Sequence, residues 1–264
     1  MAAPLPAPLP PPHPPLLAPQ NGALSGAVVD LVAFPGAGTG ASGFRDWRRL
    51  LPADWGFTVV NLPGREASYG RPFATDLAAL ADEVAAELRA HRAAGPAAPL
   101  VLFGHSMGAL LALLVAHRVP VDALVVAACA PPRSRRYDLD GDPLDDDALR
   151  IDVSEALVAA GVAELFDTLD EDLFAEMVEL AVPALRADIL LLTSFQIPTT
   201  RLDCRILALY GADDALHPAP WSDETTAAAD LRVLDGGHFF VQLAPETVIA
   251  ELQRYVASVP EGVR

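Results

Sequence analysis

Six short runs of apolar residues recur along the chain, and each is bounded by glycine, proline or aspartate. They are rich in valine, leucine and isoleucine and span residues 27–34, 57–61, 100–104, 122–129, 204–210 and 231–234. Runs that are apolar at nearly every position are typical of parallel strands buried on both faces. The pattern therefore predicts a sheet that is covered on both sides.

Between these runs the apolar positions follow a helical period, most clearly in residues 75–92, 107–118 and 245–256. Strand and helix in alternation indicate the α/β class with a mostly parallel, doubly wound sheet. Residues 134–196 break the alternation, since they contain no convincing strand and only short amphipathic helices such as residues 171–181. We expect a helical insertion there, which can act as a lid because it follows a core strand at its carboxyl end.

The first residues, 1–23, stand apart because proline is too frequent there for a helix or a sheet ladder. We expect a disordered, polyproline-like tail over this segment. Residues 24–264 are sufficient for one large domain with a buried core. The sequence therefore predicts a tail at 1–23 and one domain at 24–264, which includes the insertion at about 134–196.

The chain of 264 residues carries a formal net charge of −17 at pH 7. Binding to nucleic acid depends on a basic surface, so this charge argues against a nucleic-acid partner. Between residues 138 and 188 there are 16 Asp or Glu and two Arg, which places most of the negative charge on the expected insertion. A solvated acidic surface explains most of these carboxylates.

No apolar run reaches the roughly 18 residues that a transmembrane helix needs. The N-terminus also lacks the charged start and the apolar block of a secretory signal. We therefore expect no membrane association and a cytoplasmic location, with Cys129 and Cys204 as reduced, buried thiols.

The candidate nucleophile is Ser106, in the segment Gly104-His-Ser-Met-Gly108. The pattern G-x-S-x-G also occurs by chance, but here an apolar strand precedes it directly and an apolar helix follows it directly. This is the setting of a nucleophile elbow, a tight turn that strains the serine backbone and requires small neighbours. Gly104 and Gly108 meet that requirement, and the start of the helix places partial positive charge beside the serine.

A serine becomes an effective nucleophile only when a base accepts its proton. His238 follows the last expected strand in the segment Asp-Gly-Gly-His and is the candidate base. His217 is a second histidine that could line the same site. The residue expected to orient the base lies after the preceding strand, where Asp213 and Asp214 are adjacent.

The usual spacing places this acid three residues after a glycine. Counted from Gly211, this spacing favours Asp214 and leaves Asp213 as the alternative. Asp214 would hold the tautomer of His238 and stabilise the imidazolium that forms during catalysis. Along the chain the order is then Ser106, Asp214, His238, which is the order of the α/β-hydrolases.

Acyl transfer also needs two backbone amides directed at the oxygen of the tetrahedral intermediate. We expect Met107, which follows the nucleophile, to supply one of them. The segment Phe-Pro-Gly-Ala-Gly-Thr-Gly at 34–40 follows the first strong strand, and Ala37 is the candidate for the other. The alternating glycines of this segment lack the spacing of a dinucleotide-binding loop, and no Cys or His cluster has the spacing of a metal site. We therefore expect neither a cofactor nor a metal.

With these motifs in place, residues 27–258 resemble the type II thioesterases, the free-standing editing thioesterases of polyketide and nonribosomal peptide synthases. The matching segments are FPGAGTGASGFRDW at 34–47, NLPGRE at 61–66, LFGHSMGALLAL at 102–113, VPALRADILLLTSF at 182–195, LYGADDALHP at 209–218 and GGHFF at 236–240. The LPGRE and P-x-L-R-x-D runs are more specific than G-x-S-x-G, because general lipases lack them. One departure is Gly36, where members of the family usually have histidine.

The resemblance implies an α/β-hydrolase fold and a Ser106, Asp214, His238 triad. It also implies hydrolysis of acyl groups from the phosphopantetheine thiol of acyl or peptidyl carrier proteins. Such carriers are acidic, so docking to a chain of this charge needs a local basic patch. Arg133, Arg135 and Arg136 follow a core strand at its carboxyl end and are candidate docking residues, unless they pair with nearby carboxylates.

Other functions remain open at this point. A carboxylesterase or lipase acting on free esters would use the same three residues. An acyltransferase would pass the same acyl-enzyme to a nucleophile other than water. A non-catalytic carrier-binding protein would be expected to lack a member of the triad, and here all three members are present.

Overall fold

The computed structural model describes residues 14–20, 27–93, 98–134, 149–150, 154 and 171–258. Within these residues seven strands form one sheet in the order β1-β3-β2-β4-β5-β6-β7. The strands are β1 (Leu17–Pro19), β2 (Val29–Phe34), β3 (Trp55–Val60), β4 (Leu100–His105), β5 (Ala123–Ala127), β6 (Arg205–Gly211) and β7 (Ala229–Leu234). Strands β2 to β7 pair in parallel, and β1 alone runs antiparallel, against β3.

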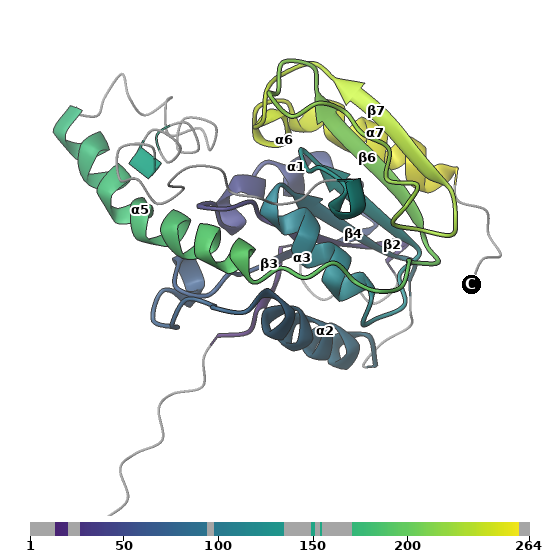
Figure 1. Cartoon of the computed structure of the whole chain (residues 1–264), viewed down its shortest axis with the longest axis horizontal. Helices are drawn as coiled ribbons and strands as arrows, with labels where there is room; N and C mark the ends of the chain where they lie inside the picture. The colour runs from purple at the N-terminus through teal and green to yellow at the C-terminus, as the bar shows by residue number, and fades with distance from the viewer. Residues whose placement is uncertain are drawn as a thin grey trace, which may run out of the picture.

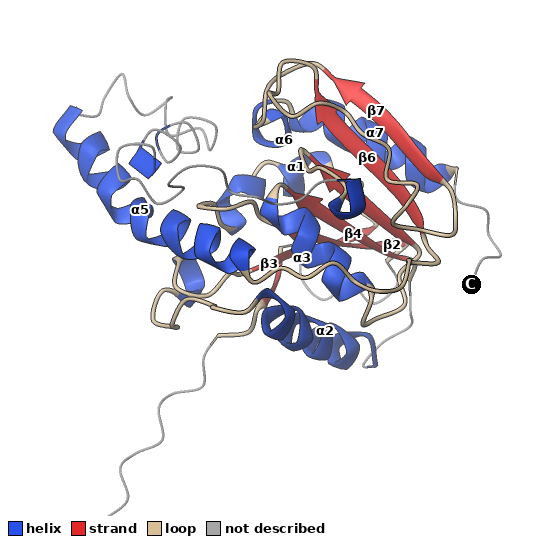
Figure 2. Cartoon of the chain, in the orientation of Figure 1, coloured by secondary structure: helices blue, strands red, loops and turns tan. Residues whose placement is uncertain are grey.

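Helices cover both faces of this sheet (Figures 1 and 2). They are α1 (Trp47–Leu50), α2 (Leu77–Ala93), α3 (Met107–Ala116), α5 (Glu171–Thr193), α6 (Phe240–Leu243) and α7 (Pro245–Ala257). Three short 3₁₀ helices lie at Ala41–Phe44, Glu66–Ser68 and Pro132–Ser134. Helices α2 and α3 share one hydrophobic core with the sheet, whereas α1 and α7 share a second core on the opposite face. The predicted doubly wound α/β architecture is confirmed.

Alternate residues of each strand supply these two cores. In β4, Leu100 and Leu102 belong to the core shared with α2 and α3, and Val101 and Phe103 belong to the other. Both sets are essentially fully buried. This is why the strands are continuous apolar runs in the sequence rather than alternating ones.

The prediction of a disordered tail at 1–23 is wrong for the residues that form β1. Leu17 pairs with Val60 of β3, and the side chain of Leu16 is fully buried. The backbone amides of Leu16 and Leu17 also donate to the carboxylate of Glu87 on α2, at 3.1 and 3.0 Å. The contacts of the two leucines thus stabilise a strand despite the prolines around them. Pro19 is tolerated because an edge strand leaves one row of amides unpaired. Residues 1–13 and 21–23 lie outside the described residues.

Helix α5 is longer than the expected segment 171–181, since it continues through Pro183 to Thr193. A proline inside a helix removes one backbone hydrogen bond. Tertiary packing offsets that loss, because Val178, Val182 and Leu185 recur at helical spacing on one face and form a buried cluster. Within the described residues, every helix is too short or too polar to cross a membrane.

Candidate active site

The site is built around the turn between β4 and α3. Ser106 occupies this turn with φ 52° and ψ −120°, a conformation that non-glycine residues rarely adopt. A Cβ atom on Gly104 would lie 2.4 Å from the Cα atom of Ala109, and one on Gly108 would lie 2.1 Å from the carbonyl oxygen of Phe34. Only glycine fits at either position, so the geometry is that of the predicted nucleophile elbow.

The structure brings His238 and Asp214 together after β7 and β6. Nδ1 of His238 lies 3.0 Å from Oδ2 of Asp214, whose side chain is only 5% exposed. The other carboxylate oxygen accepts a hydrogen bond from the amide of Leu216 at 3.0 Å. Asp213 is exposed instead, and its backbone amide donates to the carbonyl of Gly236 at 2.9 Å. Of the two candidate acids, Asp214 is therefore the one that contacts the histidine.

Ser106, Asp214 and His238 line the same pocket, which has a volume of about 340 Å³. The rest of its described wall is apolar: Met107, Leu110, Ala128, Cys129, Ala130, Leu192, Ala215 and Leu216. Within the described residues no hydrogen bond joins the Ser106 hydroxyl to His238, and in unliganded enzymes such bonds are often long or poorly aligned. The pocket thus holds the candidate nucleophile and the candidate base beside a surface suited to a hydrocarbon chain.

Two backbone amides are available beside the serine. Met107 is the first residue of α3, and within the described residues neither its amide nor that of Ala37 has a hydrogen-bond partner. A Cβ atom on Gly36 would lie 3.4 Å from the Cβ atom of Ser106, so the segment after β2 passes directly beside this serine. Both predicted oxyanion donors thus lie in segments adjacent to Ser106.

His105 lies beneath the loop that carries His238. It is almost fully buried, and its Nε2 atom lies 2.9 Å from the backbone carbonyl of His238. A carbonyl only accepts, so Nε2 carries the proton and Nδ1 is free to accept from the Gln242 amide at 3.4 Å. Burial, together with the nearby imidazole of His238, lowers the pKa of His105 to about 3. His105 is therefore a neutral residue that supports the loop carrying His238, and it does not line the pocket.

This buried imidazole makes stability depend on pH. The unfolded chain takes up a proton at His105 below about pH 6.5, whereas the folded chain does so only near pH 3. Between these values the unfolded state binds more protons, so falling pH destabilises the fold by up to about 1.4 kcal/mol per pH unit from this residue. We expect His105→Gln to show a shallower loss of unfolding free energy than the natural chain in urea titrations between pH 6.5 and 4. Parallel curves for the two chains would contradict this.

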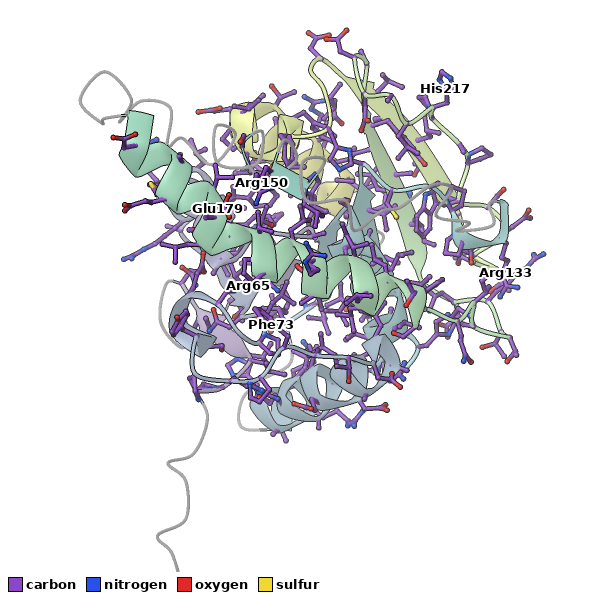
Figure 3. The ribbon with its side chains drawn as sticks, turned by 60° about the vertical axis from the view of Figure 1, so that its left-hand side comes forward. Arg65, Phe73, Arg133, Arg150, Glu179 and His217 are labelled. Atoms are coloured by element: carbon purple, nitrogen blue, oxygen red, sulfur yellow. The ribbon has the colours of Figure 1, made fainter. Side chains whose placement is uncertain are left out.

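Two other candidates from the sequence, His217 and Arg133, do not line the pocket. His217 is exposed on the surface and does not line it, so the prediction that it could do so is wrong (Figure 3). Arg133 is held by Glu224, with Nε 3.2 Å from Oε2, and it donates to the carbonyl of Thr200 at 2.9 Å. Arg135 and Arg136 lie outside the described residues. Among the described residues, no group of three or more His, Cys, Asp or Glu is arranged to hold a metal.

Some wall residues of the pocket were not candidates in the sequence. Leu192 comes from α5, and Ala128 to Ala130 follow β5, where Ala128 has φ 51°. The only available indication for the second group was that β5 ends at the same edge of the sheet as β4.

Comparison with known proteins places the chain in a family. The model of the thioesterase domain family matches residues 29–255. The chain is 33% identical over 220 residues to Thioesterase TesA of Mycobacterium leprae, and the match covers 80% of each chain. Among solved structures, RedJ, the thioesterase from the prodiginine pathway of Streptomyces coelicolor, is 30% identical with a TM-score of 0.69 and 86% of each chain covered.

A second solved structure is similar over still more of the chain. The type II thioesterase BorB from the borrelidin biosynthetic cluster is 27% identical with a TM-score of 0.69, and the match covers 91% of this chain and 97% of BorB. The family model, the relative and the two solved structures all indicate a thioesterase. The chain belongs to the thioesterase family, as a type II thioesterase-like hydrolase with the α/β-hydrolase fold.

Proposed function

We propose that this enzyme hydrolyses acyl thioesters on the phosphopantetheine arm of acyl or peptidyl carrier proteins. It would thereby remove acyl groups that stall polyketide or nonribosomal peptide synthases. The observation that carries the proposal is the His238–Asp214 hydrogen bond in the same pocket as the strained Ser106. Further support comes from the similarity to the type II thioesterases of the borrelidin and yersiniabactin pathways.

In the first half-reaction, Oγ of Ser106 attacks the thioester carbonyl while Nε2 of His238 accepts the hydroxyl proton. Asp214 accepts from Nδ1 of His238, which leaves Nε2 as the basic nitrogen and stabilises the imidazolium. The amides of Met107 and Ala37 stabilise the negative charge on the tetrahedral oxygen. The carbon–sulfur bond then breaks, His238 returns its proton to the departing sulfur, and an acyl ester of Ser106 remains.

In the second half-reaction, water attacks this ester while His238 again acts as the base. A second tetrahedral intermediate collapses, the acid leaves, and the Ser106 hydroxyl is restored by the proton on His238. The acyl chain lies along the apolar side of the pocket, against residues such as Leu110, Cys129 and Leu192. An acyltransferase would differ only in the second step, with another nucleophile in place of water.

Docking of the carrier through Arg133, Arg135 and Arg136 stays a prediction. The guanidinium of Arg133 already pairs with Glu224, a carboxylate that is 2% exposed. Arg133 therefore has a structural partner whether or not a carrier binds.

The substrate class is tested with one acyl group on two leaving groups. We expect kcat/KM for an acyl carrier protein thioester to exceed that for a p-nitrophenyl ester of the same chain length by at least about 10-fold, because contacts with the carrier add to transition-state binding. Release of free acid is followed by mass spectrometry, with and without an amine or alcohol acceptor. Equal rates on the free ester would favour the carboxylesterase or lipase, and an acyl-acceptor product in place of free acid would favour the acyltransferase.

A further inference from the structure

A buried ion pair joins α5 to the backbone beside the nucleophile. The side chain of Asp188 on α5 is 4% exposed, and its two oxygens lie 2.5 and 2.6 Å from the terminal nitrogens of Arg65. The same carboxylate accepts a hydrogen bond from the backbone amide of Gly38 at 2.8 Å. Burial raises the pKa of Asp188, and both Arg65 and the Gly38 amide oppose that rise. One carboxylate thus connects three segments that are far apart in the sequence.

The segment held in this way is the oxyanion loop, which we define as residues 35–40. Arg65 also donates to the carbonyl of Thr39 at 3.1 Å, so the pair makes hydrogen bonds to two consecutive residues of the loop, Gly38 and Thr39. Beyond the loop, the carboxylate of the neighbouring Glu66 accepts from the amide and hydroxyl of Ser42. The Arg-Glu pair of the LPGRE segment therefore fastens the loop and the turn that follows it.

Helix α5 also packs directly on the oxyanion loop. Gly38 has φ +70°, and a Cβ atom there would lie 3.2 Å from the side chain of Leu185 on α5. The side chain of Ala37 packs against the cluster that contains Val178 and Leu185. Further along the same helix, Leu192 lines the Ser106 pocket. Figure 3 shows Arg65 directly beneath α5, beside Phe73, whose ring centroid is 5.9 Å from the guanidinium carbon.

We propose that Arg65 and Asp188 form a positioning pair that holds the Ala37 amide in its catalytic orientation and couples the oxyanion loop to α5. This inference rests on the proposed function, which assigns that amide to the oxyanion hole. An oxyanion donor contributes only when it is held within about 0.5 Å of its productive position. A buried ion pair adds little stability compared with apolar residues of similar size, so geometric precision is a better explanation for this one.

The test replaces both members of the pair, as Arg65→Met with Asp188→Leu. Apolar replacement of a whole buried pair usually preserves folding, but here it removes the acceptor for the Gly38 amide and the donor to Thr39. We expect kcat on the carrier-bound thioester to fall by about 10²-fold, with KM changed by less than about threefold. Inhibition by a trifluoromethyl ketone, which forms a tetrahedral adduct on serine, should weaken by a similar factor.

Glu179→Gln is the matched control. This substitution removes the ion pair between Glu179, which is on α5, and Arg150. Both side chains are substantially exposed and lie on the other side of α5 from Arg65 (Figure 3). We expect its kcat and KM to match those of the natural chain. Arg65→Lys keeps the charge and loses the two-point contact with Asp188, so we expect a kcat between those of the natural chain and the double variant.

Each outcome of these measurements either supports or overturns the proposal. A folded double variant with kcat within threefold of the natural value, or with a change in KM alone, overturns the proposal. If the double variant does not fold cooperatively, Arg65→Lys decides: natural kcat overturns the proposal, and a loss of about tenfold at constant KM supports it. Failure of the natural chain to release the acyl group from a carrier protein would refute the proposed function itself, which is a different result from a loss seen only in the Arg65 and Asp188 variants.

Discussion

Ser106→Ala is expected to abolish release of the acyl group, with kcat reduced by about 10⁴-fold or more. The reason is that no acyl-enzyme can form once the attacking oxygen is absent, although the amides beside the serine and the base remain in place. Intact-protein mass spectrometry of an acyl carrier protein measures this directly, because hydrolysis removes the mass of the acyl group from the phosphopantetheine arm. With the natural chain the acyl mass disappears, and with the variant it persists.

The variant is not expected to lose stability, which makes this result easy to interpret. Alanine and serine both place a Cβ atom at φ 52°, so the strain of the elbow is the same in the two chains. The serine amide donates to the carbonyl of Ala127 at 2.8 Å, and this bond does not involve the side chain. We therefore expect thermal unfolding curves that nearly superimpose. Turnover by the variant above one tenth of the natural rate would show that another residue is the nucleophile.

The parts of the fold that the sequence predicted are those governed by burial. A strand buried on both faces must be apolar throughout, so β4, β5 and β6 could be recognised as short runs without reference to their neighbours. The elbow could be predicted for a different reason, since Gly104 and Gly108 face backbone atoms at distances that only a hydrogen atom permits. In each case a local steric or solvation demand leaves little choice of residue.

Features that depend on distant partners were not predictable. Strand β1 forms because Leu16 and Leu17 contact β3 and Glu87. The proline content of the segment gives no information about these distant contacts. Helix α5 passes through Pro183 because its buried face packs on other elements, and propensity alone suggested an earlier end. Arg65 and Asp188 could be singled out within specific motifs, but nothing in their spacing of 123 residues revealed that they touch.

The choice between Asp213 and Asp214 shows how far the sequence alone can predict the site. Spacing from the preceding glycine favoured Asp214, yet two adjacent carboxylates cannot be separated by composition or period. The structure separates them by environment, because one side chain is buried against His238 and the other is exposed. The same Asp→Asn substitution at each of the two positions therefore gives a test variant and its matched control.

Asp214→Asn is expected to reduce kcat by about 10⁴-fold. An asparagine there can donate its amide proton to Nδ1 of His238, which favours the tautomer with the proton on Nε2. That nitrogen then cannot accept the proton of Ser106, and no carboxylate remains to stabilise the imidazolium. Asp213→Asn makes the same change at an exposed side chain and leaves its backbone bond to the Gly236 carbonyl intact, so we expect kcat within about twofold of the natural value. Single-turnover assays of both variants on an acyl carrier protein measure the difference, with thermal unfolding as the check on folding. Equal losses in the two variants, or a larger loss at Asp213, would show that the observed hydrogen bond between His238 and Asp214 is not the one used in catalysis.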